Sequence, residues 1–406
     1  MKRGWLPVSR NVLALGGTSL LTDISAEMIT TALPLYLVYF LRLSPLEFGV
    51  VDGLYQGVAA LVRVAGGALA DRTHRYKEVA AAGYAISAIC KLVLLAVGGV
   101  WTGIAGAVLG DRLGKGLRTA PRDALISLSA PRAALATAFG VHRALDTVGA
   151  LLGPFVTFGI LALAPNAFDA VFVASFCFAL LGLGVLLLFA ENRAGAPTAA
   201  GQPRPLRHLE RAVLHSGFGR LIVVASLLAL LTISDPFLYL ALQRRGAVAV
   251  AVLPLLYVGT ALVTLALNIP LGRLADRVGR SRVFLVGYVL LALAYLVVLS
   301  PGLAWPHAIS CLALLGAYYA ATDGVLAAIA SAQLPAALRG SGLATLATAT
   351  GLARLAGSVG FGALWTWWGL ETSVLLYLGG LTGAILLALL LLRQARAGGY
   401  AVAPHG

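Results

Sequence analysis

The sequence predicts an all-α integral membrane protein with twelve transmembrane helices in two pseudo-symmetric six-helix bundles. The 406 residues are 60% hydrophobic and only 11% charged, whereas a soluble domain carries about 25% charged residues. Apolar stretches of about 20 residues, the length that crosses a bilayer, follow one another along the chain. One loop motif also occurs once in each half, which indicates an internal repeat.

Short polar breaks separate the predicted spans. The first follows a basic stretch that resembles the start of a signal peptide, but it is too long and has no small-residue cleavage pattern. The seventh contains Asp235-Pro236, which predicts a break in that helix because proline leaves a backbone carbonyl free. The spans are expected at about 11–40, 48–70, 78–99, 101–126, 134–164, 168–190, 218–242, 247–274, 282–299, 304–332, 339–368 and 371–393.

The basic residues predict the orientation of these spans. The net charge of +14 would indicate nucleic acid in a soluble protein. Here 19 of the 30 Lys and Arg residues lie on one side of the predicted layout, whereas the opposite loops hold Arg42, Arg244 and Arg245. Positive loops remain cytoplasmic. We therefore expect a bacterial inner-membrane protein with both termini cytoplasmic and no nucleic-acid partner.

A long polar segment divides the chain. Residues 191–217 contain Pro, Gly, Ala and Arg, which is typical of a linker. We expect an N-terminal bundle of residues 1–190, a cytoplasmic linker of 191–217 and a C-terminal bundle of 218–406. The motif Gly-x-Leu-Ala-Asp-Arg supports this division, since it begins at Gly67 and again at Gly272, about half the chain apart.

These two loops resemble the signature of the major facilitator superfamily. The first copy includes Gly67, Asp71, Arg72 and Arg75, and it departs from the family at His74, where a glycine is usual. The second copy is complete, with Gly272, Asp276, Arg277 and Arg280. The resemblance implies a secondary transporter that works by alternating access, with two halves moving around a central site.

Two further motifs narrow the resemblance to proton-coupled drug and metabolite exporters. The sequence Arg112-Leu-Gly-Lys115-Gly116 is similar to a motif whose arginine serves proton transfer or substrate binding in the family. The fifth span resembles the antiporter motif, although Thr157 and Phe158 replace its last glycine pair. Its matching residues are Gly140, Gly149, Gly153 and Pro154.

Acidic residues inside the spans are candidate proton sites, since an ionised group at membrane depth costs about 2.5–3.5 kcal/mol. Asp23 and Glu27 lie four residues apart and share one helix face. Two carboxylates so close in a low dielectric resist simultaneous ionisation, which suits a proton site. Arg112 or Arg143 is the expected cationic partner; a purely structural pair is the alternative.

Other charges in the spans have competing interpretations. Asp111 and Arg112 are either part of the proton site or a fixed helix–helix salt bridge. His142, Arg143 and Asp146 form a second polar face, on which the imidazole can titrate near neutral pH. Arg354 is expected to contact an anionic substrate, and Lys91 to snorkel or line the cavity. A transported metal ion at Asp23, Glu27 and His142 is a further alternative, but no resident metal site is expected.

The repeated loops are expected to hold the cytoplasmic gate shut. Asp123 is predicted to pair with Arg72 or Arg75, with Asp71 at the start of the eleventh helix. In the second half, Asp323 is predicted to pair with Arg277 and Arg280, and Asp276 to cap the fifth helix. The alternative is that these arginines only mark topology.

The sequence thus predicts proton-coupled efflux of a small organic compound by a monomer in the lipid bilayer. An uptake symporter is the nearest alternative, and a non-transporting receptor with a transporter fold is an alternative of another class. No phosphate loop is present, and no cofactor is expected. No nucleophile–base pair or metal cluster indicates an enzyme.

Overall fold

The computed structural model describes residues 9–131, 134–192, 217–302, 304–334 and 339–397. Every regular element in these ranges is a helix. The chain divides into two compact units. One consists of Met1–Gln202 with Val250–Val258, and the other of Pro203–Ala249 with Gly259–Gly406.

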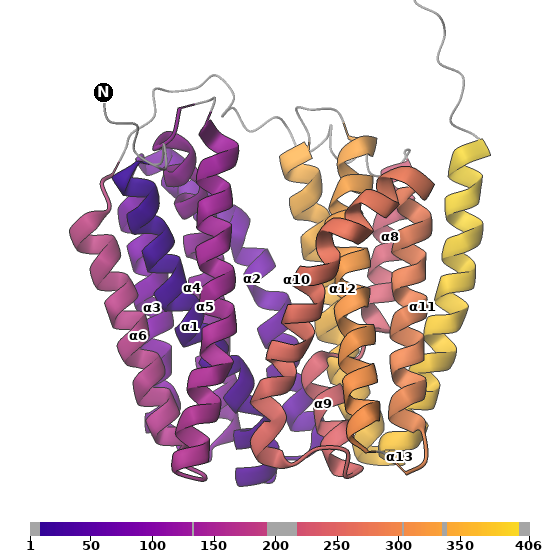
Figure 1. The fold of residues 1–406 in the computed structure, drawn as a ribbon. Coiled ribbons are helices and arrows are strands. Elements are labelled where there is room, and N and C mark those ends of the chain that lie inside the picture. The colour runs from indigo at the N-terminus through magenta and orange to yellow at the C-terminus, as the bar shows by residue number, and fades with distance from the viewer. Residues whose placement is uncertain (1–8, 132–133, 193–216, 303, 335–338, 398–406) are drawn as a thin grey trace, which may run out of the picture. The chain divides into compact units, whose positions relative to one another are not determined.

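The first unit is a bundle of six long helices (Figure 1). They are α1 (Arg10–Pro34), α2 (Pro45–Thr73), α3 (Tyr76–Ala96), α4 (Trp101–Leu128), α5 (Leu135–Leu163) and α6 (Phe168–Phe189). The sequence sets the start of α2 through a capping box, in which Ser44 and Glu47 bond each other's backbone amides. After Pro34, which has no amide hydrogen, α1 continues as a π-helix over Leu35–Phe40.

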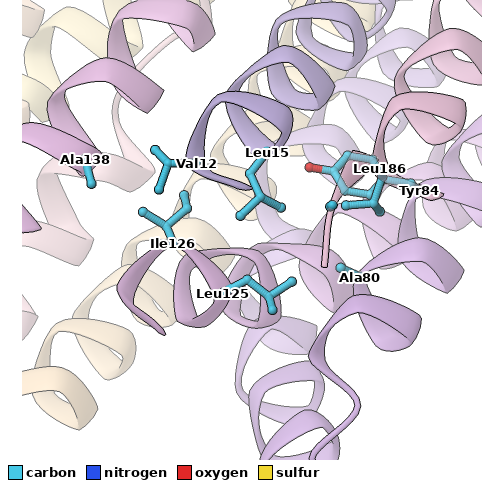
Figure 2. Packing of buried hydrophobic residues seen from close by; sticks show 9 residues of the cluster. Val12, Leu15, Ala80, Tyr84, Leu125, Ile126, Ala138 and Leu186 are labelled. Atoms are coloured by element: carbon cyan, nitrogen blue, oxygen red, sulfur yellow. The ribbon is translucent and has the colours of Figure 1, made fainter. Parts of the chain in front are cut away.

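A hydrophobic cluster joins five helices of this unit. Val12 and Leu15 of α1 pack with Leu125 and Ile126 of α4 (Figure 2). The cluster also contains Ala80 and Tyr84 of α3, Ala138 of α5, Leu186 of α6 and Ala190, which follows α6. The cluster lies near the N-terminal end of α1 and the C-terminal end of α4, and it anchors these ends of the bundle to each other.

Glycines let α4 lie directly against two neighbours. A Cβ atom on Gly114 would lie 2.6 Å from the carbonyl oxygen of Gly83 in α3. A Cβ atom on Gly116 would lie 2.7 Å from the carbonyl oxygen of Ala59 in α2. Such close backbone approach needs glycine at the contact, as is common between transmembrane helices.

The second unit contains a broken helix. Its elements are α8 (Gly217–Leu230), α9 (Asp235–Arg244), α10 (Leu253–Val278) from Gly259 onward, α11 (Arg280–Leu299), α12 (Trp305–Gln333) and α13 (Arg339–Ala397). The predicted seventh span is interrupted at residues 231–234, which confirms the break expected at Asp235-Pro236. Tyr295 Oη satisfies the opened backbone, because it accepts from the amide of Ile233 (2.6 Å) and donates to the carbonyl of Leu231 (3.1 Å).

The described helices are numerous and long enough for the twelve predicted membrane crossings. Ten helical stretches are long and apolar enough to span a bilayer. The 28-residue α4 also has the length to cross, although its charges exclude it from that number. The 59-residue α13 contains two spans, since Gly369 adopts φ 80° and ψ 169° and interrupts it. The ten stretches, the additional helix α4 and the second span within α13 together match the twelve predicted spans.

The start of the eighth span differs from the prediction, and most of the predicted linker lies outside the described residues. The eighth span was expected to begin near residue 247, but α10 begins at Leu253, after a short 3-10 turn at Val250–Val252. Most of the expected linker, residues 193–216, lies outside the described residues. The boundaries predicted for the two bundles and the linker stay predictions.

Candidate functional site

The two acids of α1 lie where α5 comes closest to it. A Cβ atom on Gly149 would lie 2.5 Å from the carbonyl oxygen of Leu20 and 3.2 Å from the Cβ of Asp23. One on Gly153 would lie 2.7 Å from the Cβ of Glu27. These two glycines of the antiporter-like motif therefore allow α5 to pack beside both carboxylates.

Lys115 of α4 lies within electrostatic range of both Asp23 and Glu27. Neither carboxylate forms an ion pair with a side chain that the structure describes. The expected partner Arg143 is exposed. The expected partner Arg112 has other contacts. The two acids are thus partly buried and lie outside the ion pairs that the described side chains form.

Arg112 belongs to a buried triad of charges between α3 and α4. Its Nε donates to Asp111 Oδ2 at 3.0 Å, and Lys91 Nζ donates to Asp111 Oδ1 at 3.0 Å. Lys91 and Arg112 are each only 3% exposed. The fixed salt bridge is therefore the arrangement of Asp111 and Arg112 in this structure. Of the two expectations for Lys91, snorkelling is wrong, because a buried carboxylate holds its ammonium group. Lys91 instead lines a small pocket together with Tyr55 and Asp111.

Tyr55 of α2 connects this triad to α1. The guanidinium carbon of Arg112 lies 3.7 Å from the centre of the Tyr55 ring, a cation–π contact. The Tyr55 hydroxyl is hydrogen-bonded to Thr30, which lies three residues after Glu27. The triad and the acid pair are thus neighbours linked through one tyrosine.

The polar face of α5 divides into a buried and an exposed part. His142 is 1% exposed, with its Nε2 3.5 Å from Asp146 Oδ2, whereas Arg143 is exposed. No group of three or more His, Cys, Asp or Glu residues that could hold a metal ion occurs in the described part of the chain. The structure therefore gives the metal-ion alternative no support.

The remaining antiporter-motif residues differ in their surroundings. Pro154 is buried within α5. A Cβ atom on Gly140 would meet nothing within 4 Å. Thr157, which replaces a glycine of the family motif, donates to the carbonyl of Met28 at 3.2 Å and thus adds a hydrogen bond between α5 and α1.

The first loop copy gives Asp123 a partner other than the predicted one. Asp123 Oδ1 accepts from Nε and Nη2 of its neighbour Arg122, at 3.1 and 2.9 Å, instead of from Arg72 or Arg75. Arg72 and Arg75 are exposed. Adding a Cβ to Gly67 would bring it within 3.2 Å of the Ala120 Cβ, so this glycine packs α2 on α4. The side chain of Asp71 lies outside the described residues.

The second loop copy forms its ion pair within the motif. Arg280 Nη2 donates to Asp276 Oδ1 at 2.9 Å, and Nη1 donates to the carbonyl of Ala328 at 3.5 Å. Asp323 forms no ion pair with a described residue. The predicted pairing of Arg280 with Asp323 is therefore not the one that forms. Gly272 has open space around its Cβ position, and Arg277 is exposed.

A second polar group lies around Arg354 of α13. Tyr318, Tyr319 and Asp323 lie within electrostatic range of its guanidinium group. Tyr319 Oη donates to Asp235 Oδ1 at 2.8 Å, which ties α12 to the first residue of α9. Arg354 itself forms no ion pair or hydrogen bond with a residue that the structure describes, and it remains a candidate for contact with an anionic group.

Sequence reasoning missed Tyr55 and the role of Lys91. A lysine in the middle of an apolar span needs an acid nearby, because unpaired charges are costly there. The position of Lys91 in an apolar span therefore indicates an acidic partner, but it does not identify that partner as Asp111. Tyr55 had no such signal, since a tyrosine in a span is compatible with ordinary packing.

The bundles and their intramembrane charges define a multi-pass membrane transporter. The sequence pattern of the Major Facilitator Superfamily matches residues 15–253 and 236–405. The chain therefore belongs to the major facilitator superfamily, whose members are secondary transporters of small molecules and not enzymes.

Relatives and solved structures agree with this assignment. An uncharacterized MFS-type transporter of Methanocaldococcus jannaschii is 30% identical over 287 residues, 70% of either chain. An uncharacterized protein of Mycobacterium tuberculosis is 35% identical over 162 residues, 39% of this chain and 38% of that protein. The nucleoside transporter NupG has a TM-score of 0.80 at 16% identity, covering 94% of this chain and 99% of its own. A POT family transporter in complex with 5-aminolevulinic acid has a TM-score of 0.82 at 13% identity, covering 98% of each. These structures share the fold.

Proposed function

We propose that this chain is a proton-coupled exporter of a small organic compound. In this proposal Asp23 and Glu27 carry the proton, and Lys115 is the cation that responds to it. The chain acts as a monomer in a bacterial inner membrane, with both termini cytoplasmic. The charge asymmetry of the loops supports this orientation.

The observation that carries the proposal is the contrast between two sets of buried acids. Asp111 is balanced by Lys91 and Arg112 at hydrogen-bond distance. Asp23 and Glu27 have no such ion pair and lie against glycines of α5. A carboxylate fixed between two cations has little freedom to change its charge. An unpaired carboxylate at membrane depth takes up a proton more readily than one held between two cations.

In this proposal, protonation of the acids changes how α1 packs against α5, and this change couples the proton to the movement of the two halves. A neutral Asp23 or Glu27 no longer attracts Lys115, and the packing of α1 on α5 and α4 then has a different energy. A ligand or proton shifts an equilibrium by as much as its interactions differ between the two states. Alternating access therefore follows if the outward- and inward-facing states differ in how they place Lys115 relative to the acids.

The test is transport by purified protein in proteoliposomes that contain the pH dye pyranine. A thermal-stabilisation screen first identifies a ligand, since any compound that binds the folded state raises its melting temperature. The proposal predicts that movement of this ligand down its gradient drives protons in the opposite direction. Ligand movement with no change in internal pH, in wild type and at several starting pH values, would contradict proton coupling.

Uptake by proton symport is the second candidate. The observation that favours it is Thr157, which binds α5 to α1 by a hydrogen bond where the antiporter motif has a glycine. In the same pyranine assay, a symporter would move protons in the same direction as the ligand. The direction of proton movement therefore separates the two candidates.

A further inference from the structure

His142 of α5 is a buried imidazole without a hydrogen-bond partner. It is 1% exposed, and neither Nδ1 nor Nε2 forms a hydrogen bond with a residue that the structure describes. Asp146, four residues later, is the acid that it faces, with Oδ2 3.5 Å from His142 Nε2. The other carboxylate oxygen of Asp146, Oδ1, is also buried and has no described hydrogen-bond partner. Buried polar groups without hydrogen bonds destabilise a fold, so this pair calls for a functional explanation.

One added proton would give the pair the hydrogen bond that it lacks. A protonated imidazole donates from both ring nitrogens, and His142 Nε2 would then donate to the Asp146 carboxylate 3.5 Å away. A protonated Asp146 would instead donate to Nε2. In both arrangements one proton is shared between a carboxylate oxygen and a ring nitrogen, and a charge-assisted bond stabilises the charged form. The pair is therefore built to accept a proton and to pass it between its two members.

The pair lies close to the acids of α1. A Cβ atom on Gly149 would lie 3.2 Å from the Cβ of Asp23. Asp146 precedes Gly149 by three residues, one helical turn on the same face, and His142 lies one further turn away. Counted from the first residue of each helix, Asp23, Asp146 and His142 lie at depths of about 19.5, about 16.5 and about 10.5 Å. The three groups form a descending series along α1 and α5.

Arg122 of α4 places a fixed positive charge at the level of His142. Ala138 of α5 packs with Ile126 of α4 in the hydrophobic cluster (Figure 2). These consecutive helices run in opposite directions, so His142, one turn after Ala138, lies level with Arg122, one turn before Ile126. Arg122 is itself held by Asp123, at 2.9 Å. A cation at this level repels an imidazolium and so favours release of the proton after it arrives.

The remaining charged groups show where the proton can leave. Besides Arg122 and Asp146, the groups within electrostatic range of His142 are Asp123, Asp23 and Arg143. The third helix packed on α5 is α6, whose one charged residue, Asp169, lies at its start. Arg143, next to His142 in the chain, is exposed. A charged side chain inside a span faces water or a partner, so the exposed Arg143 indicates water at the level of the imidazole.

We propose that the His142–Asp146 pair relays the proton between the Asp23–Glu27 pair and water on the cytoplasmic side. Asp146 receives the proton from Asp23 through one bridging water, passes it to Nε2 of His142, and the imidazolium releases it to water. Each step moves one proton from an acid to the neighbouring base, so no other reactant is needed. The proposal rests on the proton coupling proposed above and adds the route that the proton takes.

Transport in the pyranine proteoliposomes distinguishes a relay from the coupling site itself. His142→Gln and Asp146→Asn keep a polar side chain of similar size but remove the base. Each should slow pH-driven accumulation of the ligand by about 10-fold or more, since a positioned proton-transfer group contributes about 10²–10⁴-fold and water replaces it in part. Exchange of labelled for unlabelled ligand should proceed at the wild-type rate. The number of protons moved per ligand should stay unchanged, because Asp23 and Glu27 are intact.

Chemical rescue tests whether the imidazole itself carries the proton. His142→Ala should show the same slow accumulation, and added imidazole should restore most of the lost rate. Pyrazole has a similar shape but is not a base at neutral pH, and it should restore none. Equal rescue by both compounds would show that the ring only fills space, which would overturn the relay.

The controls are His307→Gln, which removes the histidine whose Nδ1 accepts from the amide of Ala304 before α12, and Asp169→Asn at the start of α6. Both should accumulate the ligand at the wild-type rate. The relay is overturned if His142→Gln and Asp146→Asn accumulate it at that rate too, while the wild type moves protons. It is also overturned if these variants lose exchange and accumulation equally, which would indicate a structural role. A wild type that moves ligand without protons would overturn the proposed coupling and the relay together.

Discussion

Both loop copies turn through a residue with positive φ, seven positions after their first glycine. In the second copy this residue is Gly279, at φ 107° and ψ 125°. In the first copy it is His74, at φ 53° and ψ 23°. His74 is the place where the sequence departs from the family signature. The departure is physically acceptable because φ and ψ there are left-handed helical, a region that histidine enters more readily than most residues.

Gly279→Ala should lower the stability of the folded protein by about 1–3 kcal/mol, since an L-residue is strained at that φ. Gly272→Ala is the matched control in the same motif, because its Cβ would lie in open space within a helix; there alanine should be neutral or slightly stabilising. Thermal unfolding in detergent compares the two. Equal melting temperatures for both variants would contradict the strain argument.

The Lys91–Asp111–Arg112 triad permits a second prediction at this scale. Asp111→Asn leaves two buried cations without an anion and should destabilise the protein by about 3–5 kcal/mol. Lys91→Met keeps the Asp111–Arg112 pair and should cost distinctly less. The measurement is the unfolding midpoint of each variant in the same detergent. A larger loss in Lys91→Met than in Asp111→Asn would show that Asp111 is not the centre of the triad.

The sequence identified most of these polar residues but not their partners. Asp23, Glu27, Asp111 and Arg112 stand out because charges in apolar spans are costly. Which charge meets which depends on the packing of α3 and α4, and helical periodicity alone does not determine this. Arg112 was therefore assigned to the acids of α1, although it bonds Asp111, its neighbour in the chain.

At the scale of the elements, hydropathy predicted the helices closely. The expected span 101–126 is α4, Trp101–Leu128, and the expected span 168–190 is α6, Phe168–Phe189. The turn chemistry was also readable, since Asp235-Pro236 predicted the break before α9. The π-helix at Leu35–Phe40 was not predicted, because no periodicity distinguishes it from the end of an α-helix.

The glycines of α5 give a prediction at the same scale. Gly149→Ala would place a methyl group 2.5 Å from the Leu20 carbonyl oxygen, so α5 must move away from α1. We expect a loss of about 1–3 kcal/mol, as for other overpacked sites. Gly140→Ala is the matched control, with nothing within 4 Å of the new methyl group. Unfolding midpoints measure both, and a destabilised Gly140→Ala with an unchanged Gly149→Ala would contradict this packing.

At the scale of the whole molecule, the loop motif recurs in equivalent places in the two halves, whereas Asp123 and Asp323 do not occupy equivalent positions. The Gly-x-Leu-Ala-Asp-Arg motif ends α2 and α10 at Thr73 and Val278. Asp123 and Asp323, which the sequence suggested as a second correspondence, lie at different depths in α4 and α12. Asp123 lies five residues before the end of α4 and Asp323 ten before the end of α12, so the two acids do not occupy equivalent positions.

The central claim is that Asp23 and Glu27 carry the coupled proton. Its most direct test compares two modes of transport in proteoliposomes with the double variant Asp23→Asn, Glu27→Gln. Exchange of labelled for unlabelled ligand across the membrane needs no net proton movement, whereas accumulation against a concentration gradient needs it. The account predicts that the variant retains exchange and loses accumulation driven by a pH gradient. Accumulation at the wild-type level would contradict it.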